Sequence, residues 1–335
     1  MLKEKSFISI SDNPFSRKGS YLTLFCSTDG QMDYGKAQLY FGNVRGTGPY
    51  RQVHAEIVKD GLVQPCVIST TESEVLLQCT DGEFRFCIGT RKFLRIRGTD
   101  GLTLRLTVIM PAFSGNATDL RDGCWQFDLG TTAQAVLLPF QGKLTTHQVF
   151  GGNLGGTIAL SFDIEPDEKG VVDVGVEEYL IDPIHRPLED YPSYEDCVKS
   201  YEEEFEEFCK LYPALPEQWE PMRRKALWTI FTLTVEPDGE TMFKHTMIKM
   251  LHGTFEHVSG WQQGMHIICL SRDPAFSWEI LCGLFDYQDA NGRIADILTD
   301  ASYARSAMKP PSQGLALNWL LDNTDTSAIP VERLR

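Results

Sequence analysis

The segment from Val75 to Leu106, VLLQCTDGEFRFCIGTRKFLRIRGTDGLTLRL, sets the architecture of the first half of the chain. Apolar and polar residues alternate on both sides of Asp81-Gly82, and they do so again on both sides of Asp100-Gly101. Alternation with a period of two is typical of half-buried strands, and Asp-Gly is a strong hairpin turn sequence. We therefore expect two successive hairpins that form an antiparallel meander with one buried face.

Runs of similar composition continue on both sides of this segment. They are Tyr21 to Cys26, Ala37 to Phe41, Ala133 to Leu138, Thr157 to Ile164 and Val171 to Tyr179. Glycine-rich segments such as 151–156 separate several of them. The pattern predicts a β-rich first domain over residues 1–187.

A helical pattern begins after Pro187. Ser193 can cap a helix, and apolar residues then recur at spacings of three and four up to Cys209. Further helices are expected over residues 217–235, 259–270, from Pro274 to a stop near Asn291-Gly292, and from Pro310 onward. The second domain, residues 188–335, is therefore predicted to consist of helix pairs joined by long, irregular loops.

Composition and charge narrow the classes of function. The chain has 335 residues and a formal net charge of −15, which argues against a nucleic-acid partner. No apolar run approaches the roughly 18 residues that a membrane helix needs, and the first residues lack the features of a signal peptide. Nine scattered cysteines without a C-x-x-C pair indicate reduced thiols, so we expect a cytoplasmic protein. The histidines match no zinc spacing, and we expect neither a metal nor a cofactor.

The loops between Phe243 and Asn323 are rich in Trp, Gln, Asp and Lys. An aromatic face stacks on the apolar side of a pyranose, while amides and carboxylates hydrogen-bond its hydroxyls. We therefore expect these loops to bind an oligosaccharide. The candidate substrate-binding residues are Trp261, Gln262, Gln288, Asp296, Lys309 and Gln313. Each has an ordinary structural alternative, because a Trp at a helix start often packs in a core and a Gln at a helix end often bonds nearby backbone.

Four elements in order resemble the trehalase and glucosidase clan, and more closely glycoside hydrolase family 63. They are the Trp-initiated helix in Ser259-Gly260-Trp261-Gln262-Gln263, Asp273-Pro274 before the next helix, the helix end from Phe285 through Gln288 to Gly292, and Lys309-Pro310-Pro311 at the following helix start. The resemblance covers residues 195–323. It implies a β-sandwich over residues 1–187, followed by the first helices of an (α/α)6 barrel over residues 188–335.

The same resemblance implies a reaction. Family members hydrolyse α-glucosidic bonds of oligosaccharides with inversion, using a carboxylic acid and a carboxylate about 6.5–9.5 Å apart. In this family the residues before Pro311 bind sugar hydroxyls. The protein is thus expected to be a glycoside hydrolase, as a fragment or a subunit.

Two departures from the family pattern affect this expectation. The family has Asp where this chain has Gln262, which removes a charge from sugar recognition. The family's general acid and base lie on later helices, so neither can be identified in this sequence, and Glu256 is only a weak catalytic candidate. A partial barrel exposes apolar helix faces, so we expect a second polypeptide or a missing C-terminal segment to complete it.

Two other functions stay open on the sequence alone. A truncated or degenerate barrel can serve as a non-catalytic carbohydrate-binding protein, which the Gln262 departure favours. A sugar epimerase built on the same helical plan would need paired histidines on later helices, and it does not explain the β-rich first domain.

Overall fold

The computed structural model describes most of the chain. The described residues are 7–11, 13–26, 38–45, 52–110, 115–120, 122–130, 133–151, 155–180, 186–239, 241–250, 257–305, 309–325 and 327. They form two compact units, one of residues 1–44 and 48–204, and one of residues 45–47 and 205–335. The division falls inside helix α1 (Tyr194–Lys210), whereas the sequence placed a domain boundary at residue 187.

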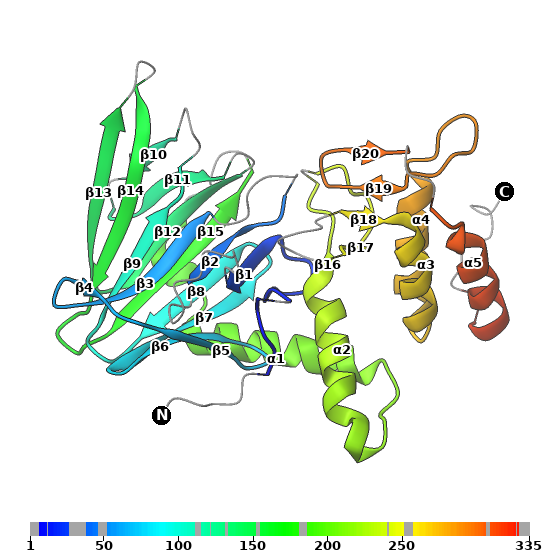
Figure 1. Ribbon diagram of the computed structural model, residues 1–335, viewed down its shortest axis with the longest axis horizontal. Helices are drawn as coiled ribbons and strands as arrows, with labels where there is room; N and C mark the ends of the chain where they lie inside the picture. Colours follow the sequence, from blue (N-terminus) through cyan, green and yellow to red (C-terminus); the bar gives the residue numbers. More distant parts are fainter. Residues whose placement is uncertain are drawn as a thin grey trace. The chain divides into compact units, whose positions relative to one another are not determined.

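The first unit is built from two antiparallel sheets (Figure 1). The seven-stranded sheet contains β1 (Leu22–Cys26), β2 (Leu39–Asn43), β3 (Val53–Lys59), β4 (Leu62–Val63), β9 (Thr103–Val108), β13 (Lys143–Gly151) and β14 (Gly156–Glu165). The eight-stranded sheet contains β5 (Val67–Thr70), β6 (Val75–Cys79), β7 (Gly82–Thr90), β8 (Phe93–Gly98), β10 (Ala117–Asp119), β11 (Trp125–Leu129), β12 (Ala133–Gln141) and β15 (Val172–Tyr179).

Aromatic side chains fill the space between the two sheets. Phe127 of β11 and Phe162 of β14 come from different sheets, and their ring centroids lie 5.6 Å apart. Phe84 and Phe86 of β7 are almost completely buried, while the alternate residue Arg85 is half exposed. The period-two alternation in the sequence thus separates the core face of the strands from their outer face.

The expectation of two successive hairpins is half right. β6 and β7 form the first hairpin, with Cys79 opposite Gly82. The second is wrong, because β8 pairs with β7 and β15 whereas β9 pairs with β3 and β14 in the other sheet. The segment around Gly101 therefore crosses between sheets. Gly101 has a φ of 72°, and its backbone NH bonds the carbonyl of Gly170, a partner far away in the sequence.

Helix α1 packs on the outer face of the eight-stranded sheet. Ser193 caps it as expected, because its hydroxyl accepts a hydrogen bond from the Asp196 backbone NH at 3.1 Å. Arg95 of β8 is buried at the contact, where it pairs with Asp173 through two hydrogen bonds of 2.6 and 3.0 Å. Cys197 lies so close to Gly89 that a Cβ at that position would be 2.3 Å from its sulfur atom. The helix thus covers polar groups that would otherwise face solvent.

The second unit is mainly helical (Figure 1). Its helices are α2 (Glu220–Leu233), α3 (Gly260–Cys269), α4 (Pro274–Phe285) and α5 (Ser312–Asn323). Short 3-10 helices in the described ranges are η1 (Leu188–Asp190), in the first unit, and η2 (Glu217–Trp219), in the second. Two small sheets accompany them, formed by β16 (Thr234–Val235) with β17 (Met247–Ile248), and by β18 (Val258–Ser259), β19 (Ile297–Leu298) and β20 (Tyr303–Ala304). The class predicted from the sequence, antiparallel β followed by α, is confirmed.

Helix α4 is shorter than expected. It ends at Phe285, whereas the sequence placed its stop near Asn291-Gly292. The carboxylate of Asp289 accepts hydrogen bonds from the backbone NH groups of Asn291 and Arg293, both at 2.9 Å. A side chain that bonds backbone in this way offers an alternative to helical hydrogen bonds, and Gly292 completes the turn with a φ of 81°.

Helices α3 and α5 are parallel neighbours. The Ser312 hydroxyl at the start of α5 donates to the Trp261 carbonyl at the start of α3. The Trp319 indole near the end of α5 donates to Ser271, just after the end of α3. Helix α4 returns between them along the chain, and Ser277 bonds the Ile267 carbonyl. The three helices are thus neighbours joined as helical hairpins.

None of the helices in the described part of the chain is long and apolar enough to span a membrane. All nine cysteines are free, and seven of them are buried. Cys269 is exposed, and Cys26 is half-buried.

Candidate functional site

A pocket of about 310 Å³ lies in the helical unit, where the start of α3, the segment after α4 and the segment before α5 meet. Its lining residues are Gly260, Gly292, Arg293, Ile294, Ala295, Asp296, Arg305, Lys309, Pro311 and Gln313. The volume lies at the lower end of the roughly 300–1,000 Å³ that is usual for small-molecule sites. Three of the six predicted substrate-binding residues, Asp296, Lys309 and Gln313, thus line one pocket, together with Gly260 from the start of α3.

Hydrogen bonds to backbone carbonyls join the segments that line this pocket. The Gly260 NH donates to the Asp296 carbonyl at 2.9 Å, and the buried Gln313 amide donates to the Gly260 carbonyl at 3.1 Å. A Cβ at Gly260 would lie 2.9 Å from the carbonyl oxygen of Ala295, so only glycine fits here without a shift. The start of α3 is therefore joined directly to Asp296, the residue before β19.

Two charged side chains that line the pocket, Asp296 and Lys309, are available to hydrogen-bond a ligand. Within the described ranges, neither the Asp296 carboxylate nor the Lys309 ammonium makes a hydrogen bond or an ion pair. The carboxylate can accept hydrogen bonds and the ammonium can donate three. The pocket can therefore bind a ligand that both donates and accepts, as sugar hydroxyls do.

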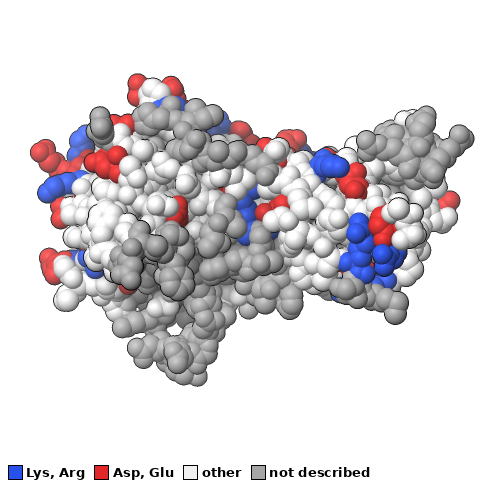
Figure 2. All heavy atoms as spheres, turned by 90° about the horizontal axis from the view of Figure 1, so that it is seen from above, with Lys and Arg blue, Asp and Glu red and all other residues white. Residues whose placement is uncertain are grey.

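Two arginines that the sequence analysis missed also line the pocket. Arg293 pairs with Asp289 at 2.8 Å, and Arg305 donates to the Tyr287 carbonyl while its guanidinium lies 4.5 Å from the centre of the Tyr303 ring. Arg293 follows the turn at Gly292, Arg305 follows β20, and their spacing matches no motif. Figure 2 shows basic side chains gathered at one place on the right-hand, helical unit, with acidic side chains beside them.

The other three predicted residues do not line the pocket. Trp261 follows Gly260 and is 37% exposed. The Gln262 side-chain oxygen is enclosed without a hydrogen-bond partner in the described structure. Gln288 is exposed, and its amide donates to the Gly292 carbonyl at 2.9 Å, so it stabilises the turn after α4. Glu256, the weak catalytic candidate, lies outside the described residues.

His257 and a buried Lys249–Asp300 ion pair are further charged or titratable groups of the helical unit. Burial lowers the pKa of His257, and the positive charges of Lys309 and Lys249 lower it further, so its imidazole is neutral at pH 7. Lys249 is completely buried, and its ammonium lies 3.6 Å from the carboxylate of the buried Asp300. Over the described ranges, no cluster of three or more His, Cys, Asp or Glu side chains is arranged to hold a metal ion.

Comparisons with known proteins give a fold and no family. No protein-family model matches the sequence. No curated protein matches it either. A family GH92 inverting mannosidase from Bacteroides thetaiotaomicron is similar in structure, with a TM-score of 0.66 and 7% identity over 95% of this chain and 51% of the mannosidase. The chain thus spans about half the length of that enzyme and shares the fold of that half.

Two polysaccharide lyases are similar over a smaller part of the chain. A heparan sulfate lyase HepC mutant from Pedobacter heparinus has a TM-score of 0.33 and 11% identity, over 55% of this chain and 37% of that chain. A heparinase III has a TM-score of 0.28 and 12% identity, over 51% of this chain and 36% of that chain. These scores are too low to inform the fold. The likeness to a glycoside-processing enzyme therefore depends on the mannosidase, and family 63 stays a prediction.

Proposed function

We propose that this chain is the substrate-binding part of an inverting glycoside hydrolase that cleaves α-glucosidic bonds of oligosaccharides. The observation that carries the proposal is the pocket of about 310 Å³ in which the Asp296 carboxylate and the Lys309 ammonium have no bonding partner among the described residues. A fold shared with half of an inverting mannosidase supports it. The choice of an α-glucosidic bond comes from the sequence resemblance alone, because the structurally similar enzyme is a mannosidase.

Inverting hydrolysis needs two carboxyl groups, one to protonate the leaving oxygen and one to activate water, about 6.5–9.5 Å apart. Asp296 is the one carboxylate in the lining of the pocket that the structure describes. We therefore assign to this chain the binding of sugar hydroxyls, and assign the general acid and base to helices that complete the ring. Those helices belong to a second polypeptide or to a further segment of the same one.

An apolar face on α3 and α5 supports this completion. Trp261, Met265 and Cys269 follow one another at four-residue spacing along α3, so they share one side of the helix, and all three are exposed. On α5, Leu315 and Trp319 have the same spacing and are 60% and 41% exposed. Water-facing positions on two packed helices seldom carry this much apolar surface, whereas a face that another helix covers does.

A non-catalytic carbohydrate-binding protein is the second candidate. One observation favours it, because Gln262 stands where the resembling family has Asp and its enclosed side-chain oxygen has no partner in the described structure. Such a protein would bind the same sugars without cleaving them. A hydrolysis assay of the completed protein separates the two candidates, since an inverting enzyme releases a product of inverted anomeric configuration that NMR detects.

Binding of maltose, nigerose and α-1,2-mannobiose, measured by calorimetry, tests the proposal. Asp296→Asn and Lys309→Met are expected to weaken binding by about tenfold or more, because a hydrogen bond to a charged group contributes roughly 1.5–3 kcal/mol. Lys244→Met is the matched control, since Lys244 is exposed and lies outside the pocket lining.

Trp261 is tested in the same titrations. The sequence-based hypothesis that Trp261 stacks on the sugar predicts that Trp261→Ala abolishes binding while Cys269→Ala leaves it intact, whereas the place of Trp261 outside the pocket lining predicts equal affinities. Equal affinities for the two variants would remove Trp261 from the site. No binding of any of the three sugars by the wild-type chain would overturn the proposed function.

A further inference from the structure

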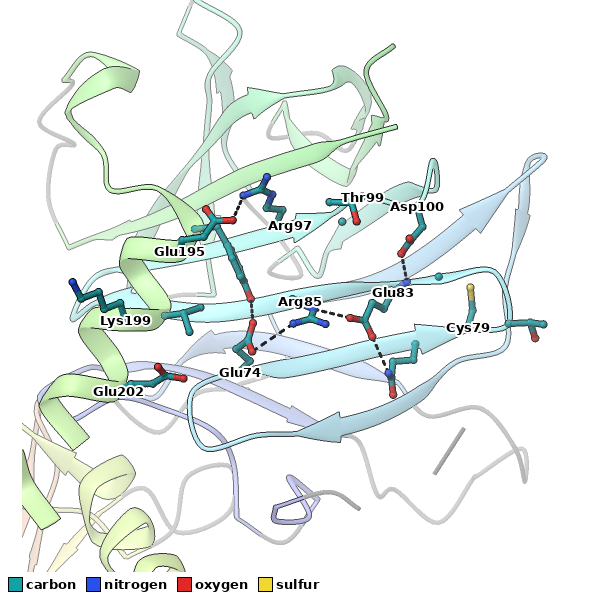
Figure 3. Close-up of a pocket in the computed structure, with 16 residues that line it drawn as sticks. Glu74, Cys79, Glu83, Arg85, Arg97, Thr99, Asp100, Glu195, Lys199 and Glu202 are labelled. Carbon is teal, nitrogen blue, oxygen red and sulfur yellow. Dashed lines mark hydrogen bonds and ion pairs between the residues drawn. The ribbon is translucent and has the colours of Figure 1, made fainter. Parts of the chain in front are cut away.

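A larger groove lies in the first unit, alongside α1 and over the outer face of β6, β7 and β8 (Figure 3). Its volume is about 830 Å³, well within the range of small-molecule sites. Five acidic and three basic side chains line it, with Tyr194, Val198 and Lys199 contributed by α1. No sequence motif marks this groove, because its residues alternate with core residues and resemble an ordinary solvent-facing side of a sheet.

The strand register creates an unusual pair of charges on the floor of the groove. Arg85 of β7 stands directly opposite Arg97 of β8, and like charges in that position repel. Glu83 offsets the first charge with a hydrogen bond of 2.6 Å, and Glu195 of α1 offsets the second with an ion pair. Figure 3 shows Arg85 between Glu74 and Glu83. The positive charges are thus neutralised within the groove.

The carboxylates of the groove are engaged as well. Glu74 accepts a hydrogen bond from the Tyr194 hydroxyl at 2.7 Å, and Glu202 accepts one from Ser73 at 3.0 Å. Asp100 accepts one from the backbone NH of Glu83 at 2.9 Å. Each of these carboxylates thus already has a hydrogen-bond donor within the groove, and the surplus of acidic residues repels a polyanion.

The capacity that remains suits neutral hydroxyls. Arg97 pairs with Glu195, and its Nε atom is enclosed in the described structure, so the bonding capacity of the groove comes from its exposed hydroxyls. The hydroxyls of Thr80 and Thr99 are exposed and make no hydrogen bond with described residues, so they can both donate and accept. Val198 and the aliphatic parts of the arginines offer apolar surface between these groups.

We infer that this groove is a second carbohydrate-binding site, which takes a neutral oligosaccharide. A sugar chain presents hydroxyls that donate and accept along its edges and C–H groups on its faces, which matches paired charges, free hydroxyls and narrow apolar strips. The inference goes beyond the proposed function, because the groove and the smaller pocket belong to different compact units.

Filling the groove tests the inference. Calorimetric titration of the full chain with maltopentaose and mannopentaose is compared for the wild type, Thr99→Trp and Thr118→Trp. Thr99→Trp places a bulky ring in the groove and is expected to weaken binding at this site by about tenfold or more, so that titration detects only the site in the helical unit. Thr118→Trp is the matched control, since Thr118 is an exposed threonine of β10 in the same sheet and lies outside the groove.

The readouts separate this site from the helical pocket. If Thr99→Trp removes part of the binding and the added substitution Lys309→Met removes the rest, the chain has two independent sites, as inferred. Unchanged binding by Thr99→Trp, with an unfolding temperature equal to that of the wild type, would overturn the second site and leave the first untouched. Tighter binding of a heparin-derived hexasaccharide than of the neutral probes would equally overturn it.

Discussion

His266 is enclosed on α3, and its environment affects the protonation of its side chain. Burial lowers the pKa of His266 to about 4, and its Nδ1 atom has no hydrogen-bond partner within the described ranges. The unfolded chain, in which the pKa returns to about 6.5, binds the proton more readily. Folding therefore favours the neutral imidazole, so the contribution of His266 to stability is complete above pH 6.5 and is lost as the pH falls toward 4.

Acid should therefore destabilise the helical unit through this residue. Between pH 6.5 and pH 4 the free energy of unfolding is expected to fall by an amount on the order of 2–3 kcal/mol that His266→Gln abolishes. Chemical denaturation at several pH values measures the slope. Met265→Gln, at the exposed neighbouring position, should keep the wild-type slope. A His266→Gln protein with an unchanged pH dependence would contradict the assignment.

The N-termini of α3 and α4 make a matched pair of helix caps. The Asp273 carboxylate accepts a hydrogen bond from the Phe276 backbone NH at 3.1 Å, and Pro274 occupies the first turn. The Ser259 side chain stands at the same position of α3, is buried and makes no capping hydrogen bond. Asp273 and Ser259 are both typical N-cap residues in sequence, but only Asp273 makes a capping hydrogen bond.

We expect Asp273→Ala to lower the free energy of unfolding by about 1 kcal/mol, because it removes a cap and leaves an NH group unpaired. Ser259→Ala should change it far less, because the lost hydroxyl bonds nothing in the described structure. Urea denaturation of both variants decides the matter, and equal losses would show that Ser259 also caps its helix.

Local patterns predicted the elements well and their partners less well. The period-two run from Val75 to Cys79 and the cap at Ser193 depend only on nearby residues, and the structure has both. Asp100-Gly101 indicates a turn but cannot say which sheet receives the next strand, since that depends on β3 and β14. Helix α4 was overestimated because the competing bonds come from the side chain of Asp289.

The residues of the candidate site could be predicted only in part, because loop composition is a local feature and the contacts between loops are not. Asp296, Lys309 and Gln313 belong to loops whose composition indicated a sugar pocket, and they meet in one pocket. The partner of Gln288 is a backbone carbonyl four residues away, which composition does not reveal. Arg293 and Arg305 were missed because no motif surrounds them. The groove beside α1 arises from strand register, which a single sequence leaves undetermined.

At the scale of the whole molecule, the apolar face of α3 and α5 should dominate behaviour in solution. We expect the chain by itself to bind the dye ANS and to self-associate with rising concentration. The double variant Met265→Lys, Leu315→Lys should reduce both effects, since these side chains are 47% and 60% exposed. Fluorescence and sedimentation velocity provide the measurements.

A control for this expectation lies in the other unit. Leu62 is 70% exposed at the short strand β4, where it stands outside the helical face. Leu62→Lys should leave dye binding and sedimentation close to those of the wild type. If it reduced them as much as the double variant does, general surface hydrophobicity would be the cause and the α3–α5 face would have no special role.

The pairing of β8 with β15 has a consequence for how the protein emerges from the ribosome. Val176 of β15 stands opposite Leu94 of β8, so the edge of β8 that faces away from β7 has no partner until translation has passed Tyr179. Unpaired strand edges recruit other chains. Nascent polypeptides that end between the two strands should therefore need chaperone protection, and a ribosome that stalls in this interval would release a chain prone to aggregate.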